Sequence, residues 1–225
     1  MSVDQQIWFS IKLSLWVSAL STMLVAVIGG GVAYVLATRQ FKGKIILEVL
    51  ITVPLIMPPT VTGYYLIMIF GRNGIVGQLL HEIAGWSIIF TWQAAVLASF
   101  IISLPLMVRT AQAAIASVDT TMRDTATMLG YSEWQTALKI LIPLSRKGIL
   151  AGIILAFARA MGEFGATLMV AGNIPGRTST MPLAIYSFAA SGDWKKAHLL
   201  VLILTLTSGL FILLARQFEL KGSRS

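Results

Sequence analysis

The stretch LSLWVSALSTMLVAVIGGGVAYVLAT, residues 13–38, decides the fold class because it contains no charged side chain. A helix of about 20 mostly apolar residues is long enough to cross the hydrocarbon core of a bilayer. Four similar stretches follow, and only one of them carries charges, Arg159 and Glu163. In a chain of 225 residues with 12% charged side chains, this pattern predicts an all-α integral membrane protein with a single transmembrane domain. The five predicted spans cover residues 13–38, 49–71, 83–108, 148–172 and 199–215.

The cations between the predicted spans indicate the orientation of the chain. Eleven of the 17 lie in the segments 39–44 and 109–147 and after residue 215, whereas five lie on the opposite side. Cytoplasmic loops carry the excess of Lys and Arg in membrane proteins. We therefore expect the N-terminus outside, and the C-terminus and segment 109–147 in the cytoplasm. The apolar stretch Met181–Ala190 is too short to cross and is expected to be re-entrant or interfacial, since a sixth span would place the C-terminus outside.

Several functional classes are disfavoured by the composition. The chain has no cysteine and only two histidines, so we predict no metal site. It has no G-x-x-x-x-G-K-[ST] phosphate loop, so it is not expected to hydrolyse ATP or to bind a cofactor itself. No nucleophile–base pair indicates an enzyme, and we predict no catalytic residue. The cations form no basic stripe with interleaved aromatics, which argues against nucleic-acid binding.

Segment 109–147 has mixed charge and the pattern of two short helices. Asp119 is a favourable N-cap for the first helix, and Gly130 follows where a left-handed residue commonly ends a helix. Ser132 and Gln135 have the spacing of a capping box for the second helix. Pro143 is expected to end or kink that helix as the chain returns to the membrane. The segment is therefore predicted to form a helix–glycine turn–helix on the cytoplasmic face.

This segment resembles the EAA loop of ABC importer permeases, whose pattern is E-A-A-x-x-x-G, nine residues, then I-x-L-P. Four residues match and three are conservative replacements: Ala126, Gly130, Ile140 and Pro143, then Asp124, Thr125 and Ile142. In that family the loop forms coupling helices that insert into a cleft on a separate ATP-binding subunit, which holds the ATP and Mg²⁺. The resemblance implies a coupling role here for Asp124, Thr125, Ala126, Gly130, Glu133, Ile140 and Pro143. An ordinary cytoplasmic loop is the alternative.

A second block narrows the resemblance. Residues 157–166, FARAMGEFGA, look like the ARxxGEFGA segment of molybdate and sulfate permeases, and residues 53–64, VPLIMPPTVTGY, are similar to the molybdate branch. The likeness covers about residues 10 to 215 and implies a type I ABC importer permease fold in the cytoplasmic (inner) membrane. It implies translocation of molybdate, with tungstate or sulfate as alternatives. A passive channel or a secondary anion transporter, which would need no ATPase, is the alternative class.

The implied partners are a second copy of the chain, two ATP-binding subunits and an extracytoplasmic oxyanion-binding protein. A homodimer also follows from the span count, because five helices enclose a pore poorly and two-fold symmetry is the common choice for an oligomer. The passage for the anion would then lie between the two copies, within the membrane lipid.

Two clusters are candidates for the translocation path or its gate. Three prolines are predicted to break the second span and to expose the start of a half-helix: Pro54, Pro58 and Pro59. Thr52, Thr60 and Thr62 lie nearby. Such an end, with hydroxyls nearby, suits an anion without trapping it. A proline kink that serves only packing is the alternative. Arg159 and Glu163 stand four residues apart and would share one helix face, either as a gate or latch or as a buried structural pair.

Overall fold

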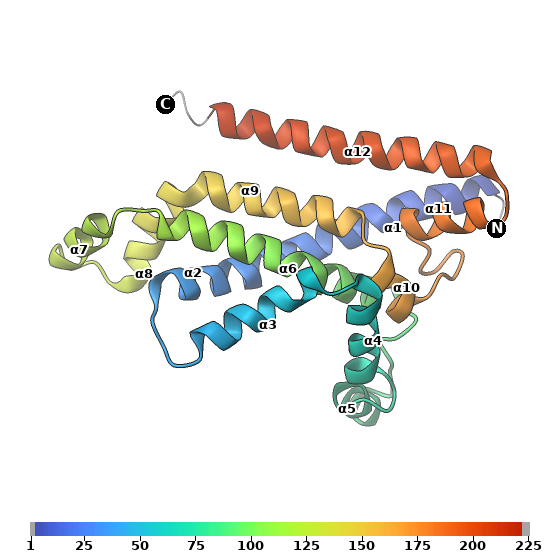
Figure 1. The fold of residues 1–225 in the computed structure, drawn as a ribbon, viewed down its shortest axis with the longest axis horizontal. Coiled ribbons are helices and arrows are strands. Elements are labelled where there is room, and N and C mark those ends of the chain that lie inside the picture. The colour runs from blue at the N-terminus through green and yellow to red at the C-terminus, as the bar shows by residue number, and fades with distance from the viewer. Residues whose placement is uncertain (1–2, 222–225) are drawn as a thin grey trace.

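The computed structural model describes residues 3–221, and every regular element among them is helical (Figure 1). Arg224, one of the eleven cations used for the orientation, lies outside these residues. The all-α prediction is therefore confirmed for the described part of the chain. The elements are α1 Val3–Leu24, η1 Val25–Gly29, α2 Gly30–Thr38, α3 Lys44–Ile56, α4 Pro59–Phe70, α5 Ile75–Ala84, α6 Trp92–Ala116, α7 Thr120–Met128, α8 Glu133–Thr136, η2 Ala137–Leu141, α9 Ile142–Met161, α10 Gly165–Ala171, α11 Met181–Ala190 and α12 Trp194–Lys221.

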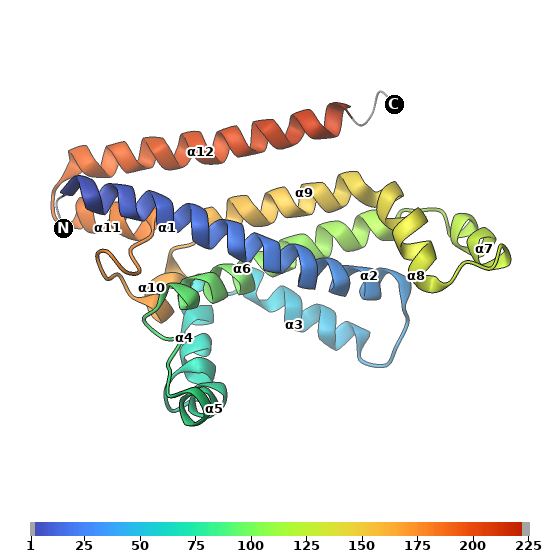
Figure 2. The same cartoon turned by 180° about the vertical axis from the view of Figure 1, so that it is seen from behind.

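Within the described part of the chain, four helical stretches are long and apolar enough to cross a membrane: Asp4–Thr38, Trp92–Ala116, Glu133–Met161 and Trp194–Leu213. All four run along the long axis of the molecule (Figures 1 and 2). The first and third each contain one π-helical turn, η1 and η2. Helices α7 and α8 lie at one end of this bundle, whereas α10 and α11 lie toward the other (Figure 2).

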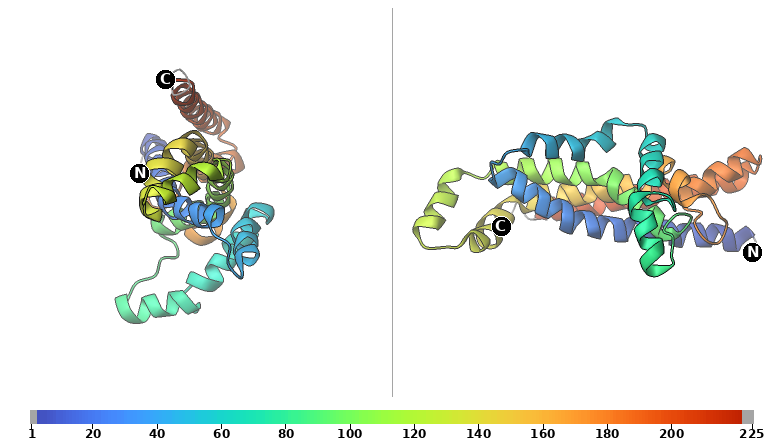
Figure 3. Two further views of the ribbon diagram at one scale, coloured as in Figure 1. Left: turned by 90° about the vertical axis from the view of Figure 1, so that its left-hand side faces the viewer. Right: turned by 90° about the horizontal axis from the view of Figure 1, so that it is seen from below.

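Two of the predicted spans are broken in the structure. In span 49–71, α3 ends at Ile56, and α4 begins after two extended residues. Proline lacks the backbone N–H that would continue the helix, so the predicted break is confirmed at Pro58 and Pro59. It is wrong at Pro54, which lies inside α3 without ending it. Helix α4 then leaves the bundle crosswise with α5 at its end (Figures 1 and 3). Span 148–172 was predicted to be continuous, and this is wrong, because α9 ends at Met161 and α10 starts at Gly165.

The third predicted span lies further along the chain than 83–108. Gly85 adopts a left-handed conformation that ends α5, and Thr91 accepts a hydrogen bond from the backbone N–H of Ala94 to cap α6. Helix α6 therefore covers Trp92–Ala116, so the first residues of segment 109–147 belong to a membrane helix. Helix α12 likewise begins earlier than residue 199, at Trp194.

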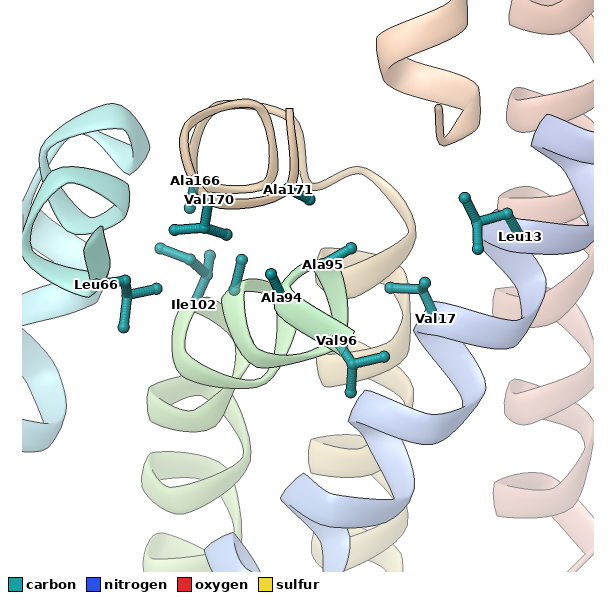
Figure 4. Packing of buried hydrophobic residues seen from close by; sticks show 11 residues of the cluster. Leu13, Val17, Leu66, Ala94, Ala95, Val96, Ile102, Ala166, Val170 and Ala171 are labelled. Carbon is teal, nitrogen blue, oxygen red and sulfur yellow. The ribbon is translucent and has the colours of Figure 1, made fainter. Parts of the chain in front are cut away.

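The core is built around α6. Its small residues Ala94, Ala95 and Ala98 are fully buried, so α1 and α10 can approach its backbone closely (Figure 4). A second buried cluster joins α2, α6 and α9 through Leu36 and Met107. This second cluster fixes the helix ends from which segment 117–141 projects.

Candidate functional site

The segment between α6 and α9 has the predicted caps and turn. The Asp119 carboxylate accepts a hydrogen bond from the backbone N–H of Thr121 at 2.9 Å, and this bond lowers the pKa of Asp119. Gly130 has φ +80°, in the left-handed region. Ser132 and Gln135 form both hydrogen bonds of the capping box that starts α8. The sequence therefore predicted the helix–glycine turn–helix correctly.

The motif residues of α7 divide between the protein interior and its surface. Ala126 is buried, whereas Asp124 and Thr125 are exposed. At the tip, Met128 and Leu129 are 87% and 72% exposed, although both are apolar and the rest of α7 is mostly polar. The resemblance treated these two positions as variable, so their apolar character was the signal that the sequence argument passed over.

Two contacts fasten this segment to the end of the first long helix. Glu133, at the start of α8, forms an ion pair with Arg39, the C-cap of α2. From α7, the Arg123 guanidinium donates a hydrogen bond to the backbone carbonyl of Thr38 at 3.2 Å. A cation at a helix C-terminus is favourable because it meets the negative end of the helix dipole. Only Glu133 of this set had been singled out from the sequence.

Pro143 was predicted to end or kink the second helix, but the structure shows no helix end at this residue. The helix runs without interruption from Glu133 to Met161, and Pro143 lies in the first turn of α9. The π-helical turn η2, which contains Ile140, comes directly before it. A wider turn at that point accommodates a proline, because the proline ring clashes with the carbonyl four residues earlier in a regular α-helix. The half-buried Ile140 thus sits in the turn that connects the loop to the membrane helix.

The two predicted path clusters come together in space through α4 and α10. A Cβ placed on Gly165 would lie 3.0 Å from Cβ of Pro59 and 3.2 Å from the backbone N of Thr60. A Cβ on Gly63 would lie 2.9 Å from Cα of Ala166. The two glycines therefore let the starts of α4 and α10 pack backbone against backbone. In this arrangement Pro58 and Thr60 are exposed, whereas Thr62 is buried.

The four-residue spacing predicted that Glu163 and Arg159 share one face of a helix. This is wrong, because Glu163 lies outside the helix that carries Arg159. It follows the end of α9, in the three-residue break before α10. Its Oε1 accepts a hydrogen bond from the backbone N–H of Ala166 at 2.8 Å, and its Oε2 lies 2.8 Å from Nη2 of Arg159. The Glu163 side chain is 1% exposed and that of Arg159 28%. The ion pair thus forms across the end of a helix, where the carboxylate also caps the next one.

Comparison with known proteins shows to which family the chain belongs. Residues 26–219 match the binding-protein-dependent transport system inner membrane component. The chain belongs to this family. It is 40% identical over 207 residues to the putative molybdenum transport system permease protein YvgM of Bacillus subtilis, covering 92% of this chain and 91% of that one. It is also 40% identical over 203 residues to the molybdenum transport system permease protein ModB of Haemophilus influenzae, covering 88% and 89%.

A solved structure shares the fold. The chain superimposes on a bacterial alginate ABC transporter, solved in complex with an alginate pentasaccharide-bound periplasmic protein, with a TM-score of 0.76. The sequence identity is 16%, and the match covers 93% of this chain and 77% of the other. The protein is thus a multi-pass inner membrane component, a transport subunit with the fold of ABC importer permeases.

A further polar cluster of this inner membrane component lies between α3 and α6. Arg109 donates hydrogen bonds to Oγ1 of Thr52 at 2.8 and 3.1 Å, and its Nη1 lies 3.9 Å from Oε2 of Glu48. The amide of Gln112 donates to Oε1 of Glu48 at 2.9 Å. Arg109, used above as a loop cation, therefore lies in a membrane helix. The spacings Glu48–Thr52 and Arg109–Gln112 each place two polar residues on one face, which was the available signal.

Proposed function

We propose that the chain is the permease subunit of an ATP-driven importer that carries molybdate across the inner membrane. The full-length likeness to two molybdenum transport permeases, at 40% identity over about nine-tenths of each chain, carries this proposal. The helix–glycine turn–helix beside the bundle supports it, because a passive channel has no need for a rigid projecting helix pair. ATP and Mg²⁺ would be held by a separate subunit.

The partner ATPase would bind the tip formed by α7, Gly130 and α8. Met128 and Leu129 offer exposed apolar side chains there, and exposed Asp124 and Thr125 offer polar ones. Ala126 would support the tip from inside. Glu133, Ile140 and Pro143 would connect it to α2 and α9, so that a displacement of the tip reaches the membrane helices. Two copies of the chain would bind two ATPases.

The membrane topology in this proposal has five crossings. The four long helices supply four of them, and the broken pair α3 and α4 supplies the remaining one. The N-terminus would lie outside and the C-terminus in the cytoplasm, which the cation count favours. The oxyanion-binding protein would then bind the outer segments 72–82 and 173–197, near α5 and α11. Helix α11 is a short helix buried against α1 and α12, and Ser14 accepts a hydrogen bond from its first N–H.

The anion would pass between two copies of the chain, beside the adjoining starts of α4 and α10. The N-terminal end of α4 has no side-chain cap, and Thr60 is exposed beside it, which gives a weak anion-attracting surface. Glu163 offsets the corresponding charge at α10. The arrangement therefore favours passage over tight binding, and Arg159 and Glu163 would hold the gate in shape.

Uptake by the reconstituted complex tests the proposal. Vesicles that contain the chain, its ATPase and its binding protein should accumulate labelled molybdate only with ATP, and in preference to labelled tungstate and sulfate. Uptake that persists without the ATPase would establish the passive or secondary class instead. Preference for tungstate or sulfate would correct the substrate and leave the class intact.

The orientation can be tested separately because the chain has no cysteine. A Met128→Cys variant should react with an impermeant thiol reagent only from the cytoplasmic side. A Trp194→Cys variant, whose position is 59% exposed at the other end of the bundle, should react only from outside. The reversed pattern would overturn both the orientation and the coupling role.

The coupling role predicts a distinctive effect at Gly130. A Cβ at this position would have nothing within 4 Å, so the protein should fold with Gly130→Leu. The left-handed backbone is unfavourable for Leu by about 1–2 kcal/mol, so the turn should rearrange and the ATPase should no longer associate. Asn tolerates this conformation, which makes Gly130→Asn the matched control and predicts retained association. Co-purification with the ATPase measures both, and normal association of the Leu variant would refute the coupling assignment.

A further inference from the structure

An apolar groove lies where α2, α6 and α9 meet, beside residues 117–141, which we call the coupling segment. Its volume is about 310 Å³, at the lower end of the range for ligand-binding pockets. The lining includes Gly30 and Gly31 of α2, Ile115 of α6, Trp134 of α8, and Ile142 and Ile149 of α9. We call this the α2–α9 groove. It extends from the apolar part of two membrane helices to the loop end of the bundle.

The chain leaves this groove open because α2 has glycines there. A Cβ on Gly31 would meet nothing within 4 Å, and one on Gly30 would meet only Cε of Met107, at 3.6 Å. Neither glycine has a left-handed backbone conformation, and neither lies in a close contact between helices. The backbone therefore does not require glycine at these two positions. The open space is therefore available to a molecule outside the chain, and its aliphatic and aromatic lining selects an apolar one.

A positive charge accompanies the apolar lining. Arg146 lies four residues after Ile142 and three before Ile149, so the three side chains share one face of α9. Arg146 is exposed, and it forms no ion pair within 4.0 Å with the side chains of residues 4–83 and 85–213. Lys147 is the next residue and Lys139 lies about two turns earlier, and both are exposed and form no ion pair with the side chains of residues 4–83 and 85–213. Nζ of Lys139 lies 5.3 Å from the centroid of the Tyr131 ring. The groove is thus an apolar trough that borders a face of α9 with exposed cations.

We propose that the α2–α9 groove binds a membrane phospholipid with an anionic headgroup. An acyl chain would lie along Gly31 and Ile149, and the headgroup phosphate would pair with Arg146. Basic pockets between membrane helices at the cytoplasmic side suit such headgroups. The lipid would touch both α2 and Trp134 of the coupling segment, so its presence would support the packing of that segment against the bundle.

The charges argue against a second copy of the chain as the occupant. A two-fold interface brings the same surface of each copy together. Such an interface would bring the exposed cations Arg146, Lys139 and Lys147 of both copies into one contact area, where like charges repel one another. An anionic lipid complements them instead.

Quenching of tryptophan fluorescence by brominated lipids tests the inference on the intact chain with its ATPase. The fluorescence of Trp134 is obtained by subtracting the fluorescence of the Trp134→Phe variant from that of the natural chain. Both are measured in phosphatidylcholine vesicles with a graded fraction of brominated lipid. Brominated phosphatidylglycerol should quench this signal at about one-fifth of the mole fraction that brominated phosphatidylcholine requires. A preference of about fivefold is what one cation near an anionic headgroup is expected to contribute. Equal quenching by the two lipids, or no quenching by either, would overturn the proposal, and the latter is the result expected of a second copy in the groove.

Variants separate the acyl and headgroup contacts. Gly31→Leu should fill the groove and abolish the preference and most of the quenching, with Gly31→Ala as a smaller substitution if the Leu variant does not fold. Gly209→Leu is the matched control, because a Cβ on Gly209 of α12 also meets nothing within 4 Å and this residue is not part of the groove. Arg146→Gln should leave the quenching by brominated phosphatidylcholine unchanged and remove the fivefold preference for brominated phosphatidylglycerol. A preference that survives both Gly31→Leu and Arg146→Gln would contradict the assignment. None of these results depends on which anion is transported.

Discussion

The structure interrupts two predicted spans, and it does so by different means. Between α3 and α4 the cause is covalent, since Pro58 and Pro59 cannot continue a helix. Between α9 and α10 no proline is present, and Gly162 and the buried carboxylate of Glu163 form the break. The two breaks meet where Gly165 adjoins Pro59. One break is thus fixed by the chain itself, whereas the other depends on tertiary contacts.

This difference predicts that mutations should affect the two breaks unequally. Pro54 and Pro105 lie inside helices, so a proline alone does not end a helix here. The break before α4 nevertheless has a local cause, because Pro58 is extended and Pro59 has no N–H to donate to the preceding turn. A break held by a buried ion pair and a single cap is lost when the carboxylate is lost. Thermal unfolding of the purified protein measures this difference, and three substitutions are expected to lower the unfolding temperature to decreasing extents.

Removal of the Glu163 carboxylate should have the largest effect. In Glu163→Leu, the N-terminus of α10 loses its cap and Arg159 loses its partner within a membrane helix. Breaking a buried ion pair from one side costs about 3–5 kcal/mol, and the partial exposure of Arg159 places this case at the lower end. The unfolding temperature should fall substantially. The unfolding temperature of Glu163→Gln should fall less, because glutamine keeps an oxygen acceptor for the Ala166 N–H. Equal decreases in the two variants would show that only the charge of Glu163 matters.

Separation of the two breaks should have an intermediate effect. In Gly63→Ala, the new Cβ would lie 2.7 Å from Cβ of Met169 and 2.9 Å from Cα of Ala166, so α4 must move away from α10. Overpacking of this kind costs about 1–3 kcal/mol. Gly209→Ala, in open space on another membrane helix, is the control and should unfold as the natural chain does. If the two glycine variants unfold alike, the close packing of α4 on α10 is wrong.

Loss of one proline should have the smallest effect. Pro59 occupies the first turn of α4, where it restricts the unfolded chain more than it shapes the folded one. Pro59→Ala should cost about 0.4–1 kcal/mol, and the break should remain because Pro58 is extended. A loss as large as that of Glu163→Leu would remove the distinction between the two breaks.

The parts of the structure that the sequence predicted are those with local causes. Asp119, Gly130 and the Ser132–Gln135 pair specify their caps and turn through neighbours a few residues away. The break at Gly162 was missed because glycine is common in continuous membrane helices, so it gives no signal of its own. The four-residue spacing of Arg159 and Glu163 predicts a shared face only where the helix continues.

Contacts between distant segments could not be predicted from one sequence. The amide of Gln112 reaches a carboxylate 64 residues away, and Arg123 reaches a carbonyl 85 residues away. The spacing of polar residues along each helix shows that a face is polar, but it does not identify the opposing helix. Which helices oppose one another depends on how the small residues of α6 allow them to pack.

The bond from Arg123 to the Thr38 carbonyl has a mechanical consequence. The carbonyl belongs to the last turn of a helix that extends from Asp4 to Thr38 and has the length to traverse the whole bilayer. A push on α7 would therefore be felt at the opposite membrane surface along a single rod. The only irregular turn of that rod is η1, at Val25–Gly29, which would set how stiffly the rod conveys the load.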